Sequence, residues 1–360
     1  MAQSDPRLNK EYSAMTLRTA IIGYGKMGRI RHNAMERHGG FDVVVACDTA
    51  VDPNARVPMV TDPMAVYDYD PDVIVCSVPN MMIPDVVCTA LARGKHVFSE
   101  KPPGRNSQDV RRMMKAEAAA PNLVLKFGFN HRVHDAIEEA HKLIQAGTMG
   151  DLYFMRGVYG KAGGPNYAQN WRNDPEQSGG GILIDQGIHM LDLFQMFAGR
   201  FNKVQSFVQR NFWTDVPVED NAFALMKNED GIVASVHSSA TQWQHTFRLE
   251  LYMRNGFISV DGILSASGSY GTEVLTVALN RLDPTGNPIP NPESQEIRFT
   301  EDHSWDKEIA EFHAAVAEGQ PLKCGTSQQA LDVMELVEAI YAADEDWSAA
   351  LRKDTLKVIG

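Results

Sequence analysis

The stretch from Leu17 to Asp48 constrains the fold of this chain more than any other. An apolar run enters three glycines at positions 23, 25 and 28, an amphipathic segment follows, and a second apolar run ends on Asp48. A strand, a glycine turn, a helix and a strand with a terminal acid form a dinucleotide-binding unit. Gly23 allows the tight turn, Gly25 lets the backbone approach a pyrophosphate, and Gly28 lets the helix pack on its strand. The stretch therefore predicts a dinucleotide site.

Further cofactor contacts are expected at the carboxyl ends of later strands, where parallel sheets bind ligands. The start of the first helix, with free N–H groups and partial positive charge, would face the phosphates. Asp48 would accept hydrogen bonds from the ribose and repel a 2′-phosphate, which favours NAD. Arg29 and Arg31 lie close enough in sequence to keep NADP as an alternative. The predicted cofactor contacts are Gly23, Tyr24, Gly25, Lys26, Met27, Gly28, Asp48, Ser77, Pro79, Asn80, Glu100 and Lys101.

Length and charge limit the remaining possibilities. A chain of 360 residues exceeds one ordinary core, so two domains are expected. The net charge of −12 argues against nucleic acid and anionic membranes as partners. No apolar run approaches the roughly 20 residues that span a bilayer, and residues 1–16 lack the apolar core of a secretory signal. The cytoplasm is therefore the expected compartment. The four cysteines show no paired spacing, which predicts neither a disulfide framework nor a metal site.

Strands alternate with helices in the first part of the chain. The predicted strands are 17–22, 41–47, 72–78, 95–99 and 123–127, and the predicted helices follow the glycine turn and cover 83–93 and 107–119. This alternation predicts a doubly wound parallel sheet of the Rossmann type.

The pattern changes near position 130. Helices are expected at 134–145 and 182–197, around a strand at 151–160 and a loop at 161–181. Six strands then follow without helices between them, at 204–209, 222–226, 232–238, 247–253, 257–260 and 273–278. Such a run predicts a mostly antiparallel sheet in a second α/β domain, which two helices at 306–317 and 327–342 complete. The expected divisions are an extension at 1–16, a cofactor domain at 17–130 and a substrate and oligomerisation domain at 131–360.

Lys101 lies at the carboxyl end of the fourth predicted strand, within Ser99-Glu-Lys-Pro102. There its ammonium would lie near the nicotinamide, where it could bind a substrate hydroxyl or stabilise a developing alkoxide. The alternative is a surface lysine paired with Glu100.

Asp185 and His189 are four residues apart, so on a helix they share one face. A carboxylate beside an imidazole suits acid–base chemistry, because the acid can hold the histidine tautomer. Three glycines at 179–181 suggest that the backbone approaches a ligand. The alternatives are a surface hydrogen bond or an incomplete metal site.

Polar and aromatic loop residues suggest a sugar or similar polyol as the substrate, held by stacking and hydrogen bonds. Arg132 or Arg172 could instead meet a phosphate, and ordinary loop surface is the other interpretation. The predicted substrate contacts are Lys101, Asn130, Arg132, Trp171, Arg172, Asp185 and His189.

These motifs together resemble the glucose–fructose oxidoreductase / inositol dehydrogenase / rhizopine catabolism (Gfo/Idh/MocA) family. The residues that carry the resemblance are the 23–28 turn, Glu100-Lys-Pro102, Gly128–Arg132, Trp171-Arg172, Gly179–Gly181 and Asp185-x-x-x-His189. The resemblance implies a Rossmann domain followed by an open, mostly antiparallel sheet that usually forms a homodimer or homotetramer interface. It implies that Lys101 binds substrate and the nicotinamide ribose, that Asp185 orients the substrate, and that His189, or in some relatives the lysine, transfers the proton.

The resulting hypothesis is an NAD(P)-dependent oxidoreductase that moves a hydride between nicotinamide and a ring carbinol of a sugar. A nucleotide sugar oxidised at C3 is favoured by resemblance. The alternatives are a free-sugar or inositol dehydrogenase, an NAD-dependent glycosidase and a non-catalytic cofactor or sugar sensor.

Overall fold

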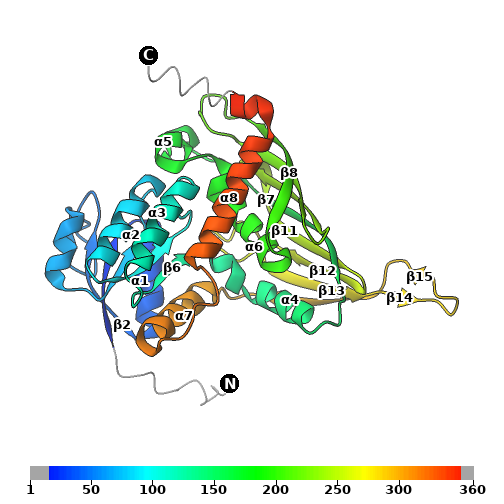
Figure 1. Cartoon of the computed structure of the whole chain (residues 1–360), viewed down its shortest axis with the longest axis horizontal. Coiled ribbons are helices and arrows are strands. Elements are labelled where there is room, and N and C mark those ends of the chain that lie inside the picture. The colour runs from blue at the N-terminus through cyan, green and yellow to red at the C-terminus, as the bar shows by residue number, and fades with distance from the viewer. Residues whose placement is uncertain (1–15, 350–360) are drawn as a thin grey trace.

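The computed structural model describes residues 16–349, which form two large β-sheets, with helices on and between them, and a small two-stranded hairpin (Figure 1). The predicted extension at 1–16 lies almost wholly outside these residues. Within them, no helix is long and apolar enough to cross a membrane. All four cysteines are free thiols.

The first sheet has six parallel strands in the order β3-β2-β1-β4-β5-β6. This order is the Rossmann arrangement, and it confirms the predicted fold class. Its buried strands are short and apolar, as parallel strands covered on both faces must be. The elements are β1 (Leu17–Ile22), α1 (Lys26–His38), β2 (Phe41–Cys47), β3 (Met59–Val60), β4 (Val73–Cys76), α2 (Ile83–Ala92), β5 (His96–Glu100), α3 (Ser107–Ala118) and β6 (Leu125–Gly128).

The second sheet has eight strands in the order β16-β13-β12-β11-β7-β10-β9-β8. Only the β7–β10 pair is parallel, which confirms a mostly antiparallel sheet. Its strands are β7 (Leu152–Ala162), β8 (Phe201–Gln209), β9 (Asn221–Asn228), β10 (Val233–Ser239), β11 (Thr241–Met253), β12 (Gly256–Asp261), β13 (Glu273–Leu279) and β16 (Ser294–Phe299). The accompanying helices are α4 (Asp135–Gln145), α5 (Pro175–Ser178), α6 (Ile188–Ala198), α7 (Ser304–Glu318) and α8 (Ser327–Ala343).

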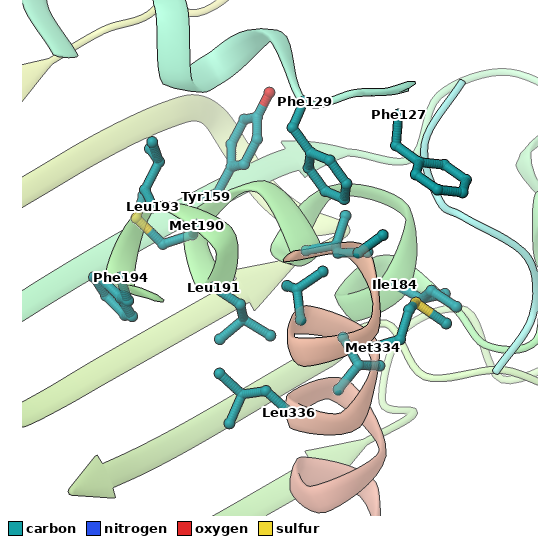
Figure 2. Close-up of a cluster of buried hydrophobic side chains, with 14 of the residues drawn as sticks. Phe127, Phe129, Tyr159, Ile184, Met190, Leu191, Leu193, Phe194, Met334 and Leu336 are labelled. Atoms are coloured by element: carbon teal, nitrogen blue, oxygen red, sulfur yellow. The ribbon is translucent and has the colours of Figure 1, made fainter. Parts of the chain in front are cut away.

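Helices α4, α6 and α8 cover one face of the second sheet, on the side of the first sheet (Figure 1). Figure 2 shows the apolar cluster beneath them, which includes Leu191 and Phe194 of α6 and Met334 and Leu336 of α8. Strand residues alternate between this covered face and the opposite one, where Phe207 is 72% exposed.

Helix α7 returns to the first sheet although it follows the second sheet in the chain. Its Ile309 and Phe312 join the buried cluster that contains Leu17 and Ile21 of β1. Phe312 also makes an edge contact with Phe98 of β5, with 5.5 Å between ring centroids. The cofactor half of the structure is therefore completed by residues from the end of the chain.

The predicted helix at 182–197 begins differently from expectation. Residues Leu183–Gly187 form a π-helical turn, and the regular helix starts only at Ile188. Gly187 packs tightly there, because a Cβ built on it would lie 2.9 Å from the Ser238 hydroxyl oxygen. This turn carries Asp185, so the predicted α-helical relation between Asp185 and His189 does not hold.

Candidate active site

The glycine turn after β1 leaves open space where a phosphate can approach. Gly23 has φ +91°, and a Cβ built on it would lie 2.5 Å from the Ser77 carbonyl oxygen. A Cβ on Gly28 would lie 2.1 Å from the Gly23 carbonyl oxygen, so this glycine is required by packing. A Cβ on Gly25 would meet no atom within 4 Å. Gly25 thus leaves space that the protein does not use, at the start of α1, as a bound pyrophosphate requires.

Asp48 lies at the end of β2 beside this turn. Its carboxylate accepts hydrogen bonds from the backbone N–H of Tyr24 at 2.8 Å and of Thr49 at 2.7 Å. The side chain is therefore held in place while remaining partly exposed. The two nearby arginines have partners of their own: Arg29 pairs with Asp52 at 2.5 Å, and the buried Arg31 pairs with Glu100 and Glu308.

Lys101 joins the two halves of the structure. It follows β5 of the first sheet, and its Nζ donates a 2.6 Å hydrogen bond to the backbone carbonyl of Asp185 in the π-helical turn. The same Nζ lies 4.0 Å from a carboxylate oxygen of Asp185. Burial lowers the pKa of Lys101, and the Asp185 charge opposes that shift. The structure therefore brings together two of the three predicted catalytic residues.

Asp185 is surrounded by cations. Its carboxylate pairs with Lys161 of β7 at 3.1 Å and with Arg172 at 3.2 Å. Burial alone would raise the pKa of this carboxyl, but the charges of Lys161, Lys101 and Arg172 outweigh burial and hold the pKa well below its ordinary value. Asp185 is therefore ionised, and its three cationic neighbours exceed it in charge by two.

His189 lies next to this cluster but does not bond to Asp185. Among the described residues, its buried Nδ1 has no hydrogen-bond partner. Its ring instead stacks on His131, with 3.6 Å between ring centroids and 15° between planes. Burial lowers the pKa of His189 well below its ordinary value, and the charges of Lys101 and His134 lower it further. The predicted carboxylate–imidazole contact is thus wrong, because the π-helical turn directs Asp185 toward cations.

A small cavity, with about 50 Å³ of space open to water, lies beside Asp185. Lys161, Tyr167, Asn170, Arg172 and Gly181 contribute to its lining. This volume lies well below the range of about 300–1,000 Å³ that is typical of small-molecule sites. Arg172 also lies over the Trp171 ring, 4.5 Å from its centroid. Arg172 of the predicted Trp171–Arg172 segment therefore lines this cavity, and the contact of Trp171 with a substrate stays a prediction.

Glu100 does not face the cofactor side as predicted. Its carboxylate binds Arg31 of α1 at 2.5 Å and is almost fully buried. Side chains alternate along a strand, so Glu100 shares the face of Phe98, which packs against α7. Lys101 takes the opposite direction, toward Asp185.

Three further predicted contacts are used within the protein. Arg132 forms a bidentate pair with the buried Asp192 of α6, at 2.6 and 2.7 Å. Asn130 donates to the Ser304 hydroxyl at 3.0 Å. Asn80 donates to the Ser178 carbonyl at 2.8 Å and links the two halves. The structure therefore does not place the Arg132 guanidinium, or these amides, where they can recognise a ligand.

The glycines at 179–181 are also occupied by protein neighbours. A Cβ on Gly179, Gly180 or Gly181 would lie 2.3, 2.3 or 2.2 Å from an oxygen of the protein. The Gly181 N–H donates to the buried Glu219 carboxylate at 2.8 Å. Close packing against the protein thus requires these glycines, and the predicted approach of this backbone to a ligand stays a prediction, with Gly181 in the lining of the cavity beside Asp185.

Two residues at the site were not predicted. Lys161 ends β7, where the sequence suggested the beginning of a loop, and a single lysine there gave no signal. His131 lies inside the Gly128–Arg132 motif but received no role. Both contacts join residues distant in sequence: Lys161 is 24 residues from Asp185, and His131 is 58 residues from His189.

The structure thus combines a Rossmann sheet that carries a dinucleotide turn with a second, mostly antiparallel sheet, and Lys101 links the two. Residues 17–127 match the domain described as "Oxidoreductase family, NAD-binding Rossmann fold", and residues 137–259 match the "GFO/IDH/MocA C-terminal domain". The chain belongs to the Gfo/Idh/MocA family.

Relatives with named activities share part of the chain. An inositol 2-dehydrogenase of Gluconacetobacter diazotrophicus is 26% identical over 61% of this chain and 66% of its own length. A D-glucoside 3-dehydrogenase of Escherichia coli is 30% identical over 56% of this chain and 60% of its own length. The alignments thus span about two thirds or less of these relatives. A solved levoglucosan dehydrogenase in complex with NADH and levoglucosan superposes with a TM-score of 0.81, at 20% identity, over 92% of this chain and 98% of that one, and so shares the fold.

Proposed function

We propose that this protein is an NAD-dependent dehydrogenase that oxidises a ring carbinol of a sugar. The observation that carries the proposal is the contact between Lys101 and Asp185, which joins the end of β5 to the π-helical turn beside His189. In a Rossmann sheet, ligands bind beyond the carboxyl ends of the strands. A substrate held at this contact would therefore lie beside the nicotinamide end of a dinucleotide bound at the glycine turn.

Lys101, His189 and Asp185 have different roles in the proposed reaction. When bound, the dinucleotide would take a hydride from the carbinol carbon. The Lys101 ammonium would hydrogen-bond the reacting oxygen and stabilise the negative charge that develops on it. His189, whose lowered pKa keeps it neutral near pH 7, would accept the hydroxyl proton. Asp185 would hold Lys101 and accept hydrogen bonds from neighbouring substrate hydroxyls. In some relatives the lysine takes the proton instead.

The cationic excess at the cavity favours a nucleotide sugar over a neutral one. Lys101, Lys161 and Arg172 surround one carboxylate. A diphosphate would compensate the two remaining charges, and Arg172 is exposed enough to reach it. The name of the D-glucoside 3-dehydrogenase supports oxidation at C3. An inositol or free-sugar substrate is the competing proposal, and the name of the inositol 2-dehydrogenase supports it.

NAD is proposed as the cofactor because the Asp48 carboxylate is held just after β2, where it would repel a 2′-phosphate. Arg31 is fully buried with two glutamates, and Arg29 is paired with Asp52. Arg31 therefore cannot reach a 2′-phosphate, whereas Arg29 keeps an exposed guanidinium, so NADP is the competing proposal.

A second copy of the chain is proposed to cover the exposed face of the second sheet. Phe207, Phe223 and Leu225 lie there, and the ring of Phe223 stacks on His237 at 4.0 Å between centroids. Adjacent apolar side chains exposed on a sheet face are typical of an oligomer interface.

The experiment is a screen of free sugars, inositols and nucleotide sugars with NAD, followed by NADH absorbance. It includes Lys101→Met, His189→Ala and, as the matched control, Lys95→Met, whose lysine directly precedes β5 and pairs with Asp70. We expect turnover to fall by about 10²–10⁴-fold in the first two variants while NAD binding persists, because each removes a group that acts in the transition state. Lys95→Met should match the wild type.

The other outcomes separate the competing functions. Full activity in both catalytic variants would contradict the assignment of Lys101 and His189. Release of an aglycone without NADH accumulation would indicate an NAD-dependent glycosidase. Tight sugar and NAD binding without turnover of any compound would indicate a sensor.

A further inference from the structure

His189 is held by its ring face rather than by hydrogen bonds. Its exposed fraction is 4%, and that of His131 is 6%. The two imidazoles are nearly parallel at 3.6 Å, whereas Phe129 and Tyr159 contact His189 at 6.3 Å between centroids. Figure 2 shows Phe129 and Tyr159 at the edge of the buried apolar cluster beneath α6. Among the described residues, the closest ring to His189 is therefore that of His131.

His131 is itself fixed by hydrogen bonds at both nitrogens. Its Nδ1 lies 3.1 Å from the Asn130 side-chain oxygen, and its Nε2 lies 3.1 Å from the Tyr159 hydroxyl. An amide oxygen only accepts, so Nδ1 carries the proton. The neutral ring then accepts at Nε2 from the Tyr159 hydroxyl, which burial keeps protonated by raising its pKa.

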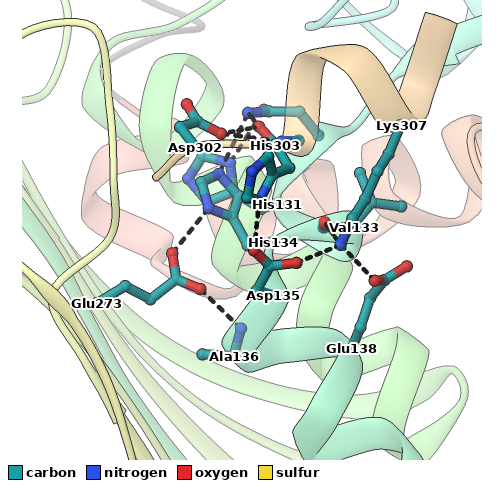
Figure 3. Close-up of polar contacts among 12 residues, drawn as sticks. His131, Val133, His134, Asp135, Ala136, Glu138, Glu273, Asp302, His303 and Lys307 are labelled. Carbon is teal, nitrogen blue, oxygen red and sulfur yellow. Dashed lines mark hydrogen bonds and ion pairs between the residues drawn. The ribbon is translucent and has the colours of Figure 1, made fainter. Parts of the chain in front are cut away.

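The orientation of Asn130 is set from further away. Its Nδ2 donates to the Ser304 hydroxyl at 3.0 Å, and that hydroxyl donates to Asp302 at 2.6 Å. The direction of these bonds leaves the Asn130 oxygen facing His131. His134, which lies 3.4 Å from the Asn130 amide, is anchored by Glu273 at 2.8 Å (Figure 3). The position of the His131 ring is thus determined by residues of α7 and β13.

We propose that His131 is a positioning residue for His189: its ring, fixed by Asn130 and Tyr159, stacks on the catalytic imidazole and sets the plane in which that imidazole works. Two stacked rings this close cannot both carry a charge in a buried site, so at most one of the two imidazoles binds a proton. The inference rests on the proposed function of His189, but nothing in that function requires His131.

The test compares an aromatic substitution of His131 with an aliphatic one. His131→Phe keeps an aromatic face against His189, whereas His131→Leu removes it. We expect kcat of His131→Leu to fall by about 10²-fold, with KM for the sugar and Kd for NAD nearly unchanged, because a misplaced general base affects the transition state more than binding. The kcat of His131→Phe should be at least tenfold higher than that of His131→Leu. His141→Leu, a histidine of α4 that contacts Phe197, is the matched control and should be unchanged.

A second readout does not depend on turnover. In the wild type, the stacked ring of His131 shifts the ring proton resonances of His189 through its ring current. In histidine-labelled protein, His131→Phe should keep such a shift and His131→Leu should lose it. A wild type without any sugar oxidation but with this pattern would overturn the proposed function and leave the stacking intact.

Two results would overturn the inference. The first is a kcat within twofold of the wild type in His131→Leu; the second is an equal loss in the leucine and phenylalanine variants. If His131→Leu does not fold, Tyr159→Phe decides, because it removes only the hydroxyl that holds Nε2. A fall in kcat of about three- to tenfold at constant KM supports the proposal, and an unchanged kcat contradicts it.

Discussion

The two stacked imidazoles make the stability of the protein depend on pH. Burial lowers the pKa of both His131 and His189 well below the ordinary value. In the unfolded chain such rings bind protons near pH 6.5. As the pH falls below that value, the unfolded state therefore holds more protons than the folded state, and the free energy of unfolding decreases. The decrease ends only where the folded rings also become protonated.

Urea unfolding between about pH 5.5 and 6.5 measures this effect. In His131→Phe one of the two rings is gone, so the slope of unfolding free energy against pH should be shallower by up to about 1.4 kcal/mol per pH unit. His303 is the control with opposite sign, because its hydrogen bond to Asp135 raises its pKa. Its contribution is present below about pH 6.5 and is lost as the pH rises through the folded pKa, so His303→Gln should alter only that higher range. Equal slopes in wild type and His131→Phe would contradict the prediction.

Asp48 is expected to determine the choice of cofactor. Asp48→Asn removes the charge but keeps an acceptor for the Tyr24 N–H. The ratio of kcat/KM for NADP to that for NAD should rise by about tenfold or more, because the repulsion of the 2′-phosphate disappears. Asp42→Asn changes an exposed aspartate of the same strand and should leave the ratio unchanged. A ratio that is equal in both variants would show that Asp48 does not face the ribose.

At the scale of single residues, the sequence predicts only those contacts that form between residues close together in the chain. The glycines at 23 and 28 were identifiable because the turn needs them within six residues. Glu100 was misplaced because its partner Arg31 is 69 residues away. Arg132 was assigned to substrate for the same reason, since Asp192 is 60 residues away. No rule of sequence spacing predicts such pairs. Only the folded structure shows which polar side chains are already paired with other residues of the protein.

At the scale of the β1–α1 unit, substitutions of two glycines should affect different properties. One substitution should lower the stability of the protein, and the other should weaken cofactor binding. A Cβ at position 28 would meet the Gly23 carbonyl at 2.1 Å, whereas a Cβ at position 25 would meet no atom within 4 Å. Gly28→Ala should therefore destabilise the protein by about 1–3 kcal/mol or more through overpacking. Gly25→Ala should keep the thermal stability of the apoprotein and weaken NAD binding by about tenfold or more, because the methyl group occupies the approach of the pyrophosphate. Calorimetric unfolding and NAD titration of both variants measure this, and a normal NAD affinity in Gly25→Ala would contradict it.

The elements with a clear apolar pattern were predicted to within a few residues. This holds for β1, β2, β5, α7 and α8, since buried faces impose a period on the sequence. Strand β16 was missed because five of its six residues are exposed and carry no alternation. The hairpin of β14 (Arg281–Leu282) and β15 (Pro288–Ile289) was missed for the same reason. The π-helical turn was missed because its apolar residues also fit an α-helix. The predicted domain limits at 130 and 131 stay a prediction.

At the scale of the whole molecule, the exposed face of the second sheet should form the contact between subunits. Phe207→Asp places a charge at the side chain that is 72% exposed, and its neighbours across the strand pair are apolar. We expect the oligomer to dissociate in light scattering after size exclusion, because burying that charge without a partner is unfavourable.

Val51→Asp is the matched control, because Val51 is 56% exposed on a loop of the first half. It should keep the wild-type mass. A wild type that is monomeric at micromolar concentration, or a Phe207→Asp variant with unchanged mass, would show that this face is not the interface.

The return of α7 to the first sheet has a consequence for biosynthesis. Ile309 and Phe312 fill the core beneath β1, and the N–H of Phe127 in β6 donates to the Gly325 carbonyl at 2.7 Å. A ribosome that has released only the six parallel strands has released an incomplete core. The core of the nascent cofactor half therefore stays incomplete until nearly two hundred further residues have been synthesised. During that interval, the apolar residues that α7 later covers are exposed and can bind chaperones. The N-terminal sheet is thus synthesised first, but its hydrophobic core is among the last parts of the protein to be completed.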